Sequence, residues 1–411
     1  MAERRSSSTT SLYAALGSVV SLAAQALFAL FLLKLFDATA VGQFSVVSQI
    51  AFCWATLALA QSPLSLLADR HTTAHTAAAA AWRQSALRLL WLAPWAALAL
   101  WWAHSRSDAG SADWRALAAW AAAVAVMQMT WLLAQSFTLR QAAPAAVASV
   151  RLLPPVLAAL VAWIGAVVLG STDSGTLLLS ALLGYGAGAA WLLPALQASG
   201  TRSGEAEQAA PTPGDDRSTR LKLLHTLSDV VVSGLLAVQW QALYGTAEAG
   251  MLLVLLRVFG FIPGLVHSAW AQVAIGQGEA RRRASLRMAV LACAVIAVIA
   301  LAIEVALRLA WLKASWQGLA AYLWPLALWQ MAACAMAAHA HRPFTDGRAA
   351  RLSRQCIAMN ALMLALLCLP LSTALLGLAW SAQQHLLLLC GFMTLALLVQ
   401  ALDHGLHRPK P

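Results

Sequence analysis

Inside the apolar run Met251–Phe261 the sequence places a single charged residue, Arg257. An ionisable side chain in such a run is costly to bury and is therefore a candidate for function. Its guanidinium presents a fixed fork of hydrogen-bond donors, which suits a phosphate or a pyrophosphate. Two structural roles stay open for it: an ion pair with Asp229 on the preceding apolar segment, or a side chain that extends to the aqueous boundary.

Five further polar residues lie within or at the edge of apolar runs: Asp229, Gln25, Gln49, Gln61 and Lys34. Asp229 could carry a coupling proton or cation instead of pairing with Arg257. The three glutamine amides suit sugar hydroxyls, with helix–helix contacts as the alternative. Lys34 is near the end of its run, where a lysine usually extends to the membrane surface. We predict that these residues and Arg257 form the binding site, and no catalytic residue is expected.

Long apolar segments must hold these residues in place. Of the 411 residues, 61% are apolar and 10% are charged, and the mean hydropathy is +0.71, which excludes a water-soluble fold. A helix needs ~20 mostly apolar residues to cross a bilayer, and we count about twelve such segments. They are Leu12–Phe36, Val41–Ala68, Leu87–His104, Trp114–Phe137, Ala145–Gly170, Gly175–Gln197, Leu221–Tyr244, Ala249–Ile275, Leu286–Trp311, Leu319–His339, Ile357–Trp380 and His385–Leu402. The sequence predicts an all-α polytopic membrane protein.

The net charge of +11 follows the predicted topology. All 27 lysines and arginines except Lys34, Arg106, Arg115, Arg257, Arg308 and Lys313 fall in or beside one set of loops. By the positive-inside rule those loops and both termini are cytoplasmic, as an even number of spans requires. The basic loops therefore indicate orientation and contact with anionic lipids rather than with nucleic acid. Composition and compact loops point to a bacterial inner membrane.

This charge asymmetry predicts which positions are accessible from outside the cell. Single cysteines at positions 107, 173 and 383 should react with a membrane-impermeant thiol reagent on intact cells. Cysteines at 205 and 347 should react only after the membrane has been permeabilised. Labelling of position 205 from outside would contradict the predicted topology.

The chain divides into two predicted bundles of six helices, residues 1–197 and 221–411. A polar segment that carries Pro and Gly, Ala198–Arg220, separates them and is typical of a cytoplasmic linker. A shift that places Leu243 on Leu35 also places Gly250 on Gly42 and Arg257 on Gln49. Two similar bundles with parallel topology would leave a substrate cleft at their interface, as in transporters that rock between two states.

Two segments carry a family resemblance. The segment Leu35–Phe44 (LFDATAVGQF) begins the second predicted helix, and Ala242–Gly250 (ALYGTAEAG) repeats the pattern at the eighth. Both are similar to the start of helix two in Wzx-type flippases, which belong to the polysaccharide transporter branch of the multidrug/oligosaccharidyl-lipid/polysaccharide (MOP) superfamily. The continuation Leu256–Val273 also resembles helix eight of that family. The resemblance extends weakly over all twelve spans.

This resemblance implies a MOP/MATE-like fold and a function. The family moves undecaprenyl-pyrophosphate-linked oligosaccharides across the bacterial inner membrane for O-antigen, capsule or exopolysaccharide synthesis. The implied partners are the lipid-linked oligosaccharide, membrane lipids, a coupling ion (H⁺ or Na⁺), and a polysaccharide polymerase with its chain-length regulator. No cofactor or metal is implied. In that setting Arg257 would contact the pyrophosphate, and the glutamines would contact the sugars.

Two other functions would require features that this sequence lacks. A MATE-like cation-coupled drug antiporter would share the fold but is expected to carry a carboxylate deep in helix one or two, where this chain has none. A membrane glycosyltransferase or polymerase generally needs a large external loop with acidic residues, and the longest outer loop here is Ser105–Asp113. No lysine follows a glycine, so the chain has no Walker A loop and ATP hydrolysis is excluded. As a transporter, it is not expected to be an enzyme.

Three local features predict structure rather than chemistry. Gly184, Gly186 and Gly188 lie on one helix and permit close packing. Glu304 and Arg308 are spaced i, i+4 and should form a local ion pair. The prolines Pro63, Pro154, Pro155, Pro263 and Pro325 should kink or unwind helices.

Overall fold

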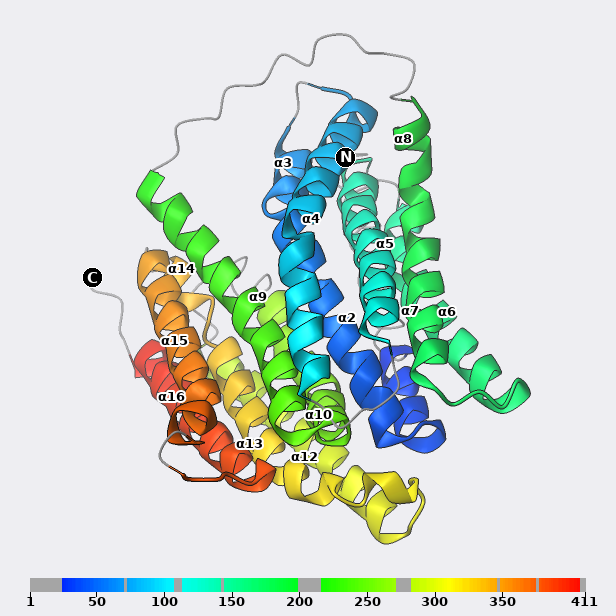
Figure 1. The fold of residues 1–411 in the computed structure, drawn as a ribbon. Helices are drawn as coiled ribbons and strands as arrows, with labels where there is room; N and C mark the ends of the chain where they lie inside the picture. The colour runs from blue at the N-terminus through cyan, green and yellow to red at the C-terminus, as the bar shows by residue number, and fades with distance from the viewer. Residues whose placement is uncertain are drawn as a thin grey trace. The chain divides into compact units, whose positions relative to one another are not determined.

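The structure, a computed structural model, describes residues 24–69, 72–106, 113–141, 144–198, 216–270, 282–345, 348–374 and 377–406. All regular elements in these ranges are helices (Figure 1). Eleven of the helices described are long and apolar enough to cross a membrane, and the shorter apolar helix Ala24–Leu35 precedes them. The predicted all-α polytopic fold is therefore confirmed. Residues 12–23 of the first predicted span, and 199–215 of the predicted linker, lie outside the described ranges.

The helices fall into two compact units. Unit 1 comprises residues up to 211 and Trp240–Ala247, and unit 2 comprises Thr212–Gln239 and the residues from Glu248 onward. Unit 1 contains Ala24–Leu35, α2 (Ala38–Leu59), α3 (Ser62–Ala68), α4 (Ala74–Ser105), α5 (Trp114–Arg140), α6 (Pro144–Trp163), η1 (Ile164–Val168), α7 (Ser174–Ala189), η2 (Ala190–Leu192) and α8 (Leu193–Ala198). Unit 2 contains most of α9 (Asp216–Tyr244) and α10 (Thr246–Leu265), then η4 (Val266–Trp270), α12 (Arg282–Arg308), η6 (Ala314–Trp316), α13 (Leu319–Ala337), α14 (Arg342–Thr345), α15 (Ala349–Ala374) and α16 (Ala382–Leu406).

Three helix pairs recur in both units. In unit 1, α5 packs against α4 and α7, and α6 packs against α7. In unit 2, α13 packs against α12 and α16, and α15 packs against α16. In chain order these are the third, fourth, fifth and sixth spans of each half. The shared pairing agrees with the internal repeat that the sequence indicates.

Small side chains form much of the core of unit 1. Ala51, Ala55, Ala125 and Ala134 are fully buried beside Met129 and its neighbours. Alanine brings helix backbones close together, so van der Waals contact replaces the hydrophobic effect that is missing inside a bilayer. The predicted close packing at the α7 glycines is confirmed for Gly184 and Gly188, but not for Gly186. A Cβ atom on Gly184 would lie 2.6 Å from the carbonyl oxygen of Pro154 in α6.

The second predicted span, Val41–Ala68, is not one helix. It ends as α2 at Leu59 and restarts as α3 at Ser62, and Ala60 between them has a positive φ of 46°. Pro63 is the cause: it has no N–H to donate to the carbonyl of Leu59, and its ring would clash with that carbonyl in a continuous helix. This confirms the predicted effect of Pro63.

The third predicted span, Leu87–His104, begins earlier than expected. Helix α4 starts at Ala74, where the Thr73 hydroxyl accepts a hydrogen bond from the amide of Thr76 at 3.3 Å. This cap is followed by five consecutive alanines, Ala77–Ala81, which have the highest helix propensity. Arg83, which lies outside the predicted span, is therefore helical.

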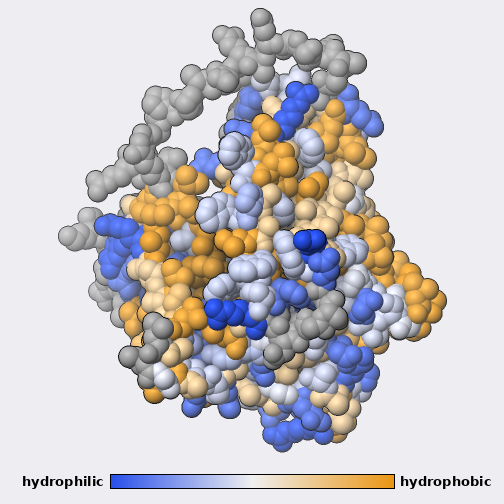
Figure 2. Space-filling model, in the orientation of Figure 1, coloured by the Kyte–Doolittle hydropathy of each residue, from blue (hydrophilic) through white to orange (hydrophobic). Residues whose placement is uncertain are grey.

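The outer surface of α4 is strongly apolar. Leu87, Leu90, Trp91, Trp95 and Leu98 are exposed at a spacing of three to four residues, and Trp91 is 82% exposed. Figure 2 shows orange, apolar patches on the face of the molecule that it draws. An apolar stripe of this size on a water-facing helix would aggregate, whereas lipid tails solvate it. Together with the spans, it makes this chain a multi-pass membrane protein.

Candidate functional site

A cluster of polar side chains joins α9 to α15 in unit 2. His225 Nε2 lies 3.2 Å from Asp229 Oδ2, one helical turn away. Asn360 Nδ2 of α15 donates to Ser228 Oγ at 2.8 Å and also to Asp229 Oδ1. We call His225, Ser228, Asp229 and Asn360 the α9–α15 cluster. The Asp229 side chain is 53% exposed, so the cluster is reachable from outside the helix pair.

The cluster combines a carboxylate, an imidazole and an amide on two neighbouring helices. A carboxylate hydrogen-bonded to an imidazole can take up or release a proton without leaving an unpaired charge. The described ranges contain no group of three or more His, Cys, Asp or Glu placed to hold a metal ion. The sequence suggests an ion pair between Asp229 and Arg257. In the structure, the polar partners of Asp229 are His225 and Asn360.

Sequence reasoning named Asp229 but missed His225, Ser228 and Asn360. The i, i+4 spacing of His225 and Asp229 was a usable signal, because it places both on one face of a helix. Asn360 was visible as an amide inside the predicted span Ile357–Trp380. Its pairing with Asp229 joins residues 131 positions apart, which no local pattern specifies.

Arg257 lies near the middle of the helical run formed by α10 and η4. Its neighbours Leu252, Val254 and Leu255 are buried, whereas the Arg257 side chain is exposed. The guanidinium thus leaves α10 on the side away from the core of its own unit. A cation at the centre of a membrane-spanning helix, facing outward from its unit, is suited to an anionic ligand in a water-filled path.

The candidate residues of the first helix do not share a face. Gln25 is exposed and Lys34 is half-buried on Ala24–Leu35. They are nine residues apart, and at about 100° per residue their side chains leave opposite sides of the helix. Gln49 is half-buried on α2, where its Nε2 lies 3.7 Å from Cys53 Sγ. One binding surface can therefore use Gln25 or Lys34, but not both.

Gln61 is not inside a span, contrary to the prediction. It lies exposed in the break between α2 and α3, where its carbonyl accepts hydrogen bonds from Leu64 and Ser65 at 3.0 and 2.9 Å. Arg88 of α4 closes this break by donating to the Leu59 carbonyl at 3.5 Å and to Ser62 Oγ at 3.3 Å. The arginine thus supplies the donor that Pro63 cannot. Sequence reasoning placed Arg88 at the start of a span and counted it among the basic residues beside a cytoplasmic loop, so it did not predict these contacts.

Comparisons with known proteins give the fold a context. No protein-family model and no curated protein matches this sequence. Among solved structures, the chain resembles the lipid II flippase MurJ in an inward closed conformation, with a TM-score of 0.57 and 11% identity over 96% of this chain and 86% of that one. The chain therefore shares the fold of that structure. It also resembles MATE in complex with MaL6, with a TM-score of 0.53 and 12% identity over 96% of this chain and 95% of that one. The predicted MATE-like fold is thereby confirmed.

Proposed function

We propose that this chain is a flippase that moves an undecaprenyl-pyrophosphate-linked oligosaccharide from the cytoplasmic to the outer leaflet of a bacterial inner membrane. The observation that carries the proposal is Arg257, an exposed guanidinium halfway along a membrane-spanning helix. A headgroup with a pyrophosphate needs such a counter-charge to cross the bilayer, and bidentate donors match its oxygens. The resemblance of Leu35–Phe44 and Ala242–Gly250 to the Wzx branch supports the same substrate class.

The remaining candidate residues except Lys34 fit this proposal with separate roles. Gln49 on α2 and Gln25 on the first helix would contact sugar hydroxyls, and Gln61 would do so at the cytoplasmic opening. The α9–α15 cluster would bind the coupling proton or cation through Asp229. Both termini would be cytoplasmic, and the polymerase and chain-length regulator would receive the flipped substrate.

A MATE-like antiporter is the second candidate, because the chain also has the fold of MATE and the α9–α15 cluster holds a protonatable His–Asp pair. Such a protein would export organic cations. A basic residue at Arg257 would repel a cation at the same place, which favours the flippase.

Reconstitution distinguishes the two functions. Liposomes would carry a fluorescent undecaprenyl-pyrophosphate oligosaccharide, and a membrane-impermeant reductant would quench the outer leaflet only. With the chain present, quenching should proceed well beyond the outer-leaflet half within minutes, and empty liposomes should stop at that half. In parallel, ethidium accumulation would be measured in cells that express the chain. If cells export ethidium and the inner-leaflet fluorescence in the liposomes persists, the flippase proposal is wrong and the antiporter is favoured.

A further inference from the structure

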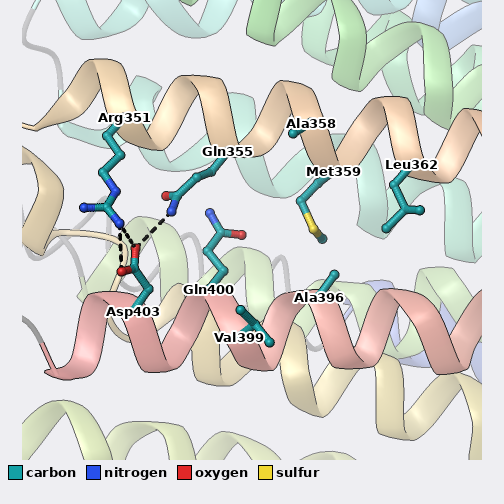
Figure 3. A pocket seen from close by; sticks show the side chains of 9 residues that line it. All are labelled: Arg351, Gln355, Ala358, Met359, Leu362, Ala396, Val399, Gln400 and Asp403. Carbon is teal, nitrogen blue, oxygen red and sulfur yellow. Dashed lines mark hydrogen bonds and ion pairs between the residues drawn. The ribbon is translucent and has the colours of Figure 1, made fainter.

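A groove of about 460 Å³ runs along α15 and α16 within unit 2 (Figure 3). Its two ends differ in chemistry. The polar end is formed by Arg351, Gln355, Gln400 and Asp403, and the apolar end is lined by Ala358, Met359, Leu362, Ala396 and Val399. The volume is within the range of about 300–1,000 Å³ that is usual for small-molecule sites.

The polar end is held in one arrangement by an ion pair. Arg351 Nη2 donates to both carboxylate oxygens of Asp403, at 2.8 and 2.9 Å, and Gln355 Nε2 donates to Asp403 Oδ2 at 3.0 Å. These bonds connect α15 to α16 and fix the direction of the Gln355 amide (Figure 3). The groove is therefore preformed at this end.

Two buried amide atoms of groove-lining residues have no hydrogen-bond partner among the described residues. They are the acceptor Gln355 Oε1 and the donor Gln400 Nε2. Gln400 is only 5% exposed. A buried polar atom left unpaired costs about 1–3 kcal/mol, and two of opposite type in one groove point to an occupant that supplies both a donor and an acceptor.

The apolar end of the groove fits an elongated apolar group. From Arg351 to Leu362 the groove follows α15 over eleven residues, or ~16 Å at 1.5 Å per residue. The groove is thus aligned with two helices that cross the membrane, and so with the lipid chains beside them. Asn360, which belongs to the α9–α15 cluster, lies on the opposite face of α15. It follows groove residue Ala358 by two positions, and two positions correspond to about 200° around the helix.

Charge selects the head of the occupant. Arg354 is exposed beside the polar end, and Arg342 donates to the carbonyls of His404 and Gly405 at 3.0 and 2.7 Å. With Arg348 and Arg351, these arginines outnumber the single carboxylate of Asp403. Basic residues near the membrane surface attract the headgroup of an anionic lipid.

We propose that the α15–α16 groove is a binding site for an anionic glycerophospholipid of the phosphatidylglycerol type. One acyl chain lies along Ala358, Met359 and Leu362. The lipid oxygens accept from Gln400 Nε2, a headgroup hydroxyl donates to Gln355 Oε1, and the phosphate lies near Arg351 and Arg354. The site is independent of the proposed transport function, because it is on the face of α15 away from the α9–α15 cluster.

Native mass spectrometry of the full chain in detergent tests this site. Dioleoyl phosphatidylglycerol, phosphatidylethanolamine or phosphatidylcholine would be added, and the number of retained lipids counted. Gln400→Leu removes the unpaired amide, and Ala358→Trp fills the groove. Ala361→Trp is the matched control, an exposed alanine on the same helix that does not line the groove. Size-exclusion profiles would establish that each variant is folded.

The wild-type chain should retain one phosphatidylglycerol more tightly than either zwitterionic lipid. Loss of one hydrogen bond predicts about three- to tenfold weaker retention in Gln400→Leu, and Ala358→Trp should lose the bound lipid, whereas Ala361→Trp should match the wild type. Equal retention of all three lipids, or equal loss in both tryptophan variants, would mean annular lipid only and would overturn the proposal. A Gln400-dependent preference for phosphatidylethanolamine would overturn the anionic class.

Discussion

Replacing Arg257 with alanine should reduce flipping of the pyrophosphate-linked substrate at least tenfold while the protein still inserts and accumulates. A hydrogen bond to a charged group contributes about 1.5–3 kcal/mol, so loss of a bidentate contact corresponds to a factor of ten or more. Arg257→Lys should recover part of the rate, because an ammonium keeps the charge but loses the planar fork. The liposome quenching assay measures the rate, and immunoblotting of membranes measures abundance.

The structure also predicts how Arg257 and Asp229 behave together. Asp229 keeps His225 and Asn360 as partners when Arg257 is removed, so no orphaned carboxylate should lower the abundance of Arg257→Ala. The double variant Arg257→Leu with Asp229→Leu should stay inactive, since it offers nothing to the phosphates. Arg308→Ala is the matched control, because that arginine is exposed on α12 and pairs only locally with Glu304. A double variant that flips substrate at the wild-type rate would remove Arg257 from the binding site.

Gly184→Ala should lower the thermal stability of the protein, and Gly186→Ala on the same helix should not. A Cβ atom at Gly184 would lie 2.6 Å from the Pro154 carbonyl oxygen and 3.2 Å from Ala158 Cβ. Because the closest atom is backbone, α6 and α7 must separate, and overpacking of this kind costs about 1–3 kcal/mol. At Gly186 the nearest atom is Met127 Sδ at 3.9 Å, an ordinary contact.

The measurement is the melting temperature of detergent-solubilised protein, followed by size-exclusion chromatography after heating. Gly184→Ala should melt several degrees below the wild type, as about 1–3 kcal/mol implies for a large chain. Gly186→Ala should be unchanged or slightly more stable, because alanine favours a helix by up to about 1 kcal/mol over glycine. Equal melting temperatures for the two variants would show that α6 and α7 do not approach each other at Gly184.

Local features of the sequence were sufficient for much of the fold. The membrane-spanning helices follow from the length of each apolar run, because every backbone polar group in a bilayer must be paired within its own helix. The Glu304–Arg308 ion pair is confirmed, since i, i+4 residues are neighbours in any helix. Pro63 broke the second span for an equally local reason, the missing N–H.

Only the tertiary structure decided which face of each helix packs against a neighbour and which face is exposed. A helix that is apolar all round, such as α13, carries no pattern that says which face meets which neighbour. The partners of Asp229, the hydrogen bonds of Arg88 to the α2–α3 break, and the two unpaired amides of Gln355 and Gln400 all depend on rotation and register between distant helices. Sequence therefore determined that this is a membrane-spanning helical protein with a few charges inside. Packing between helices determined where those charges point, because contacts between residues far apart in the chain fix it.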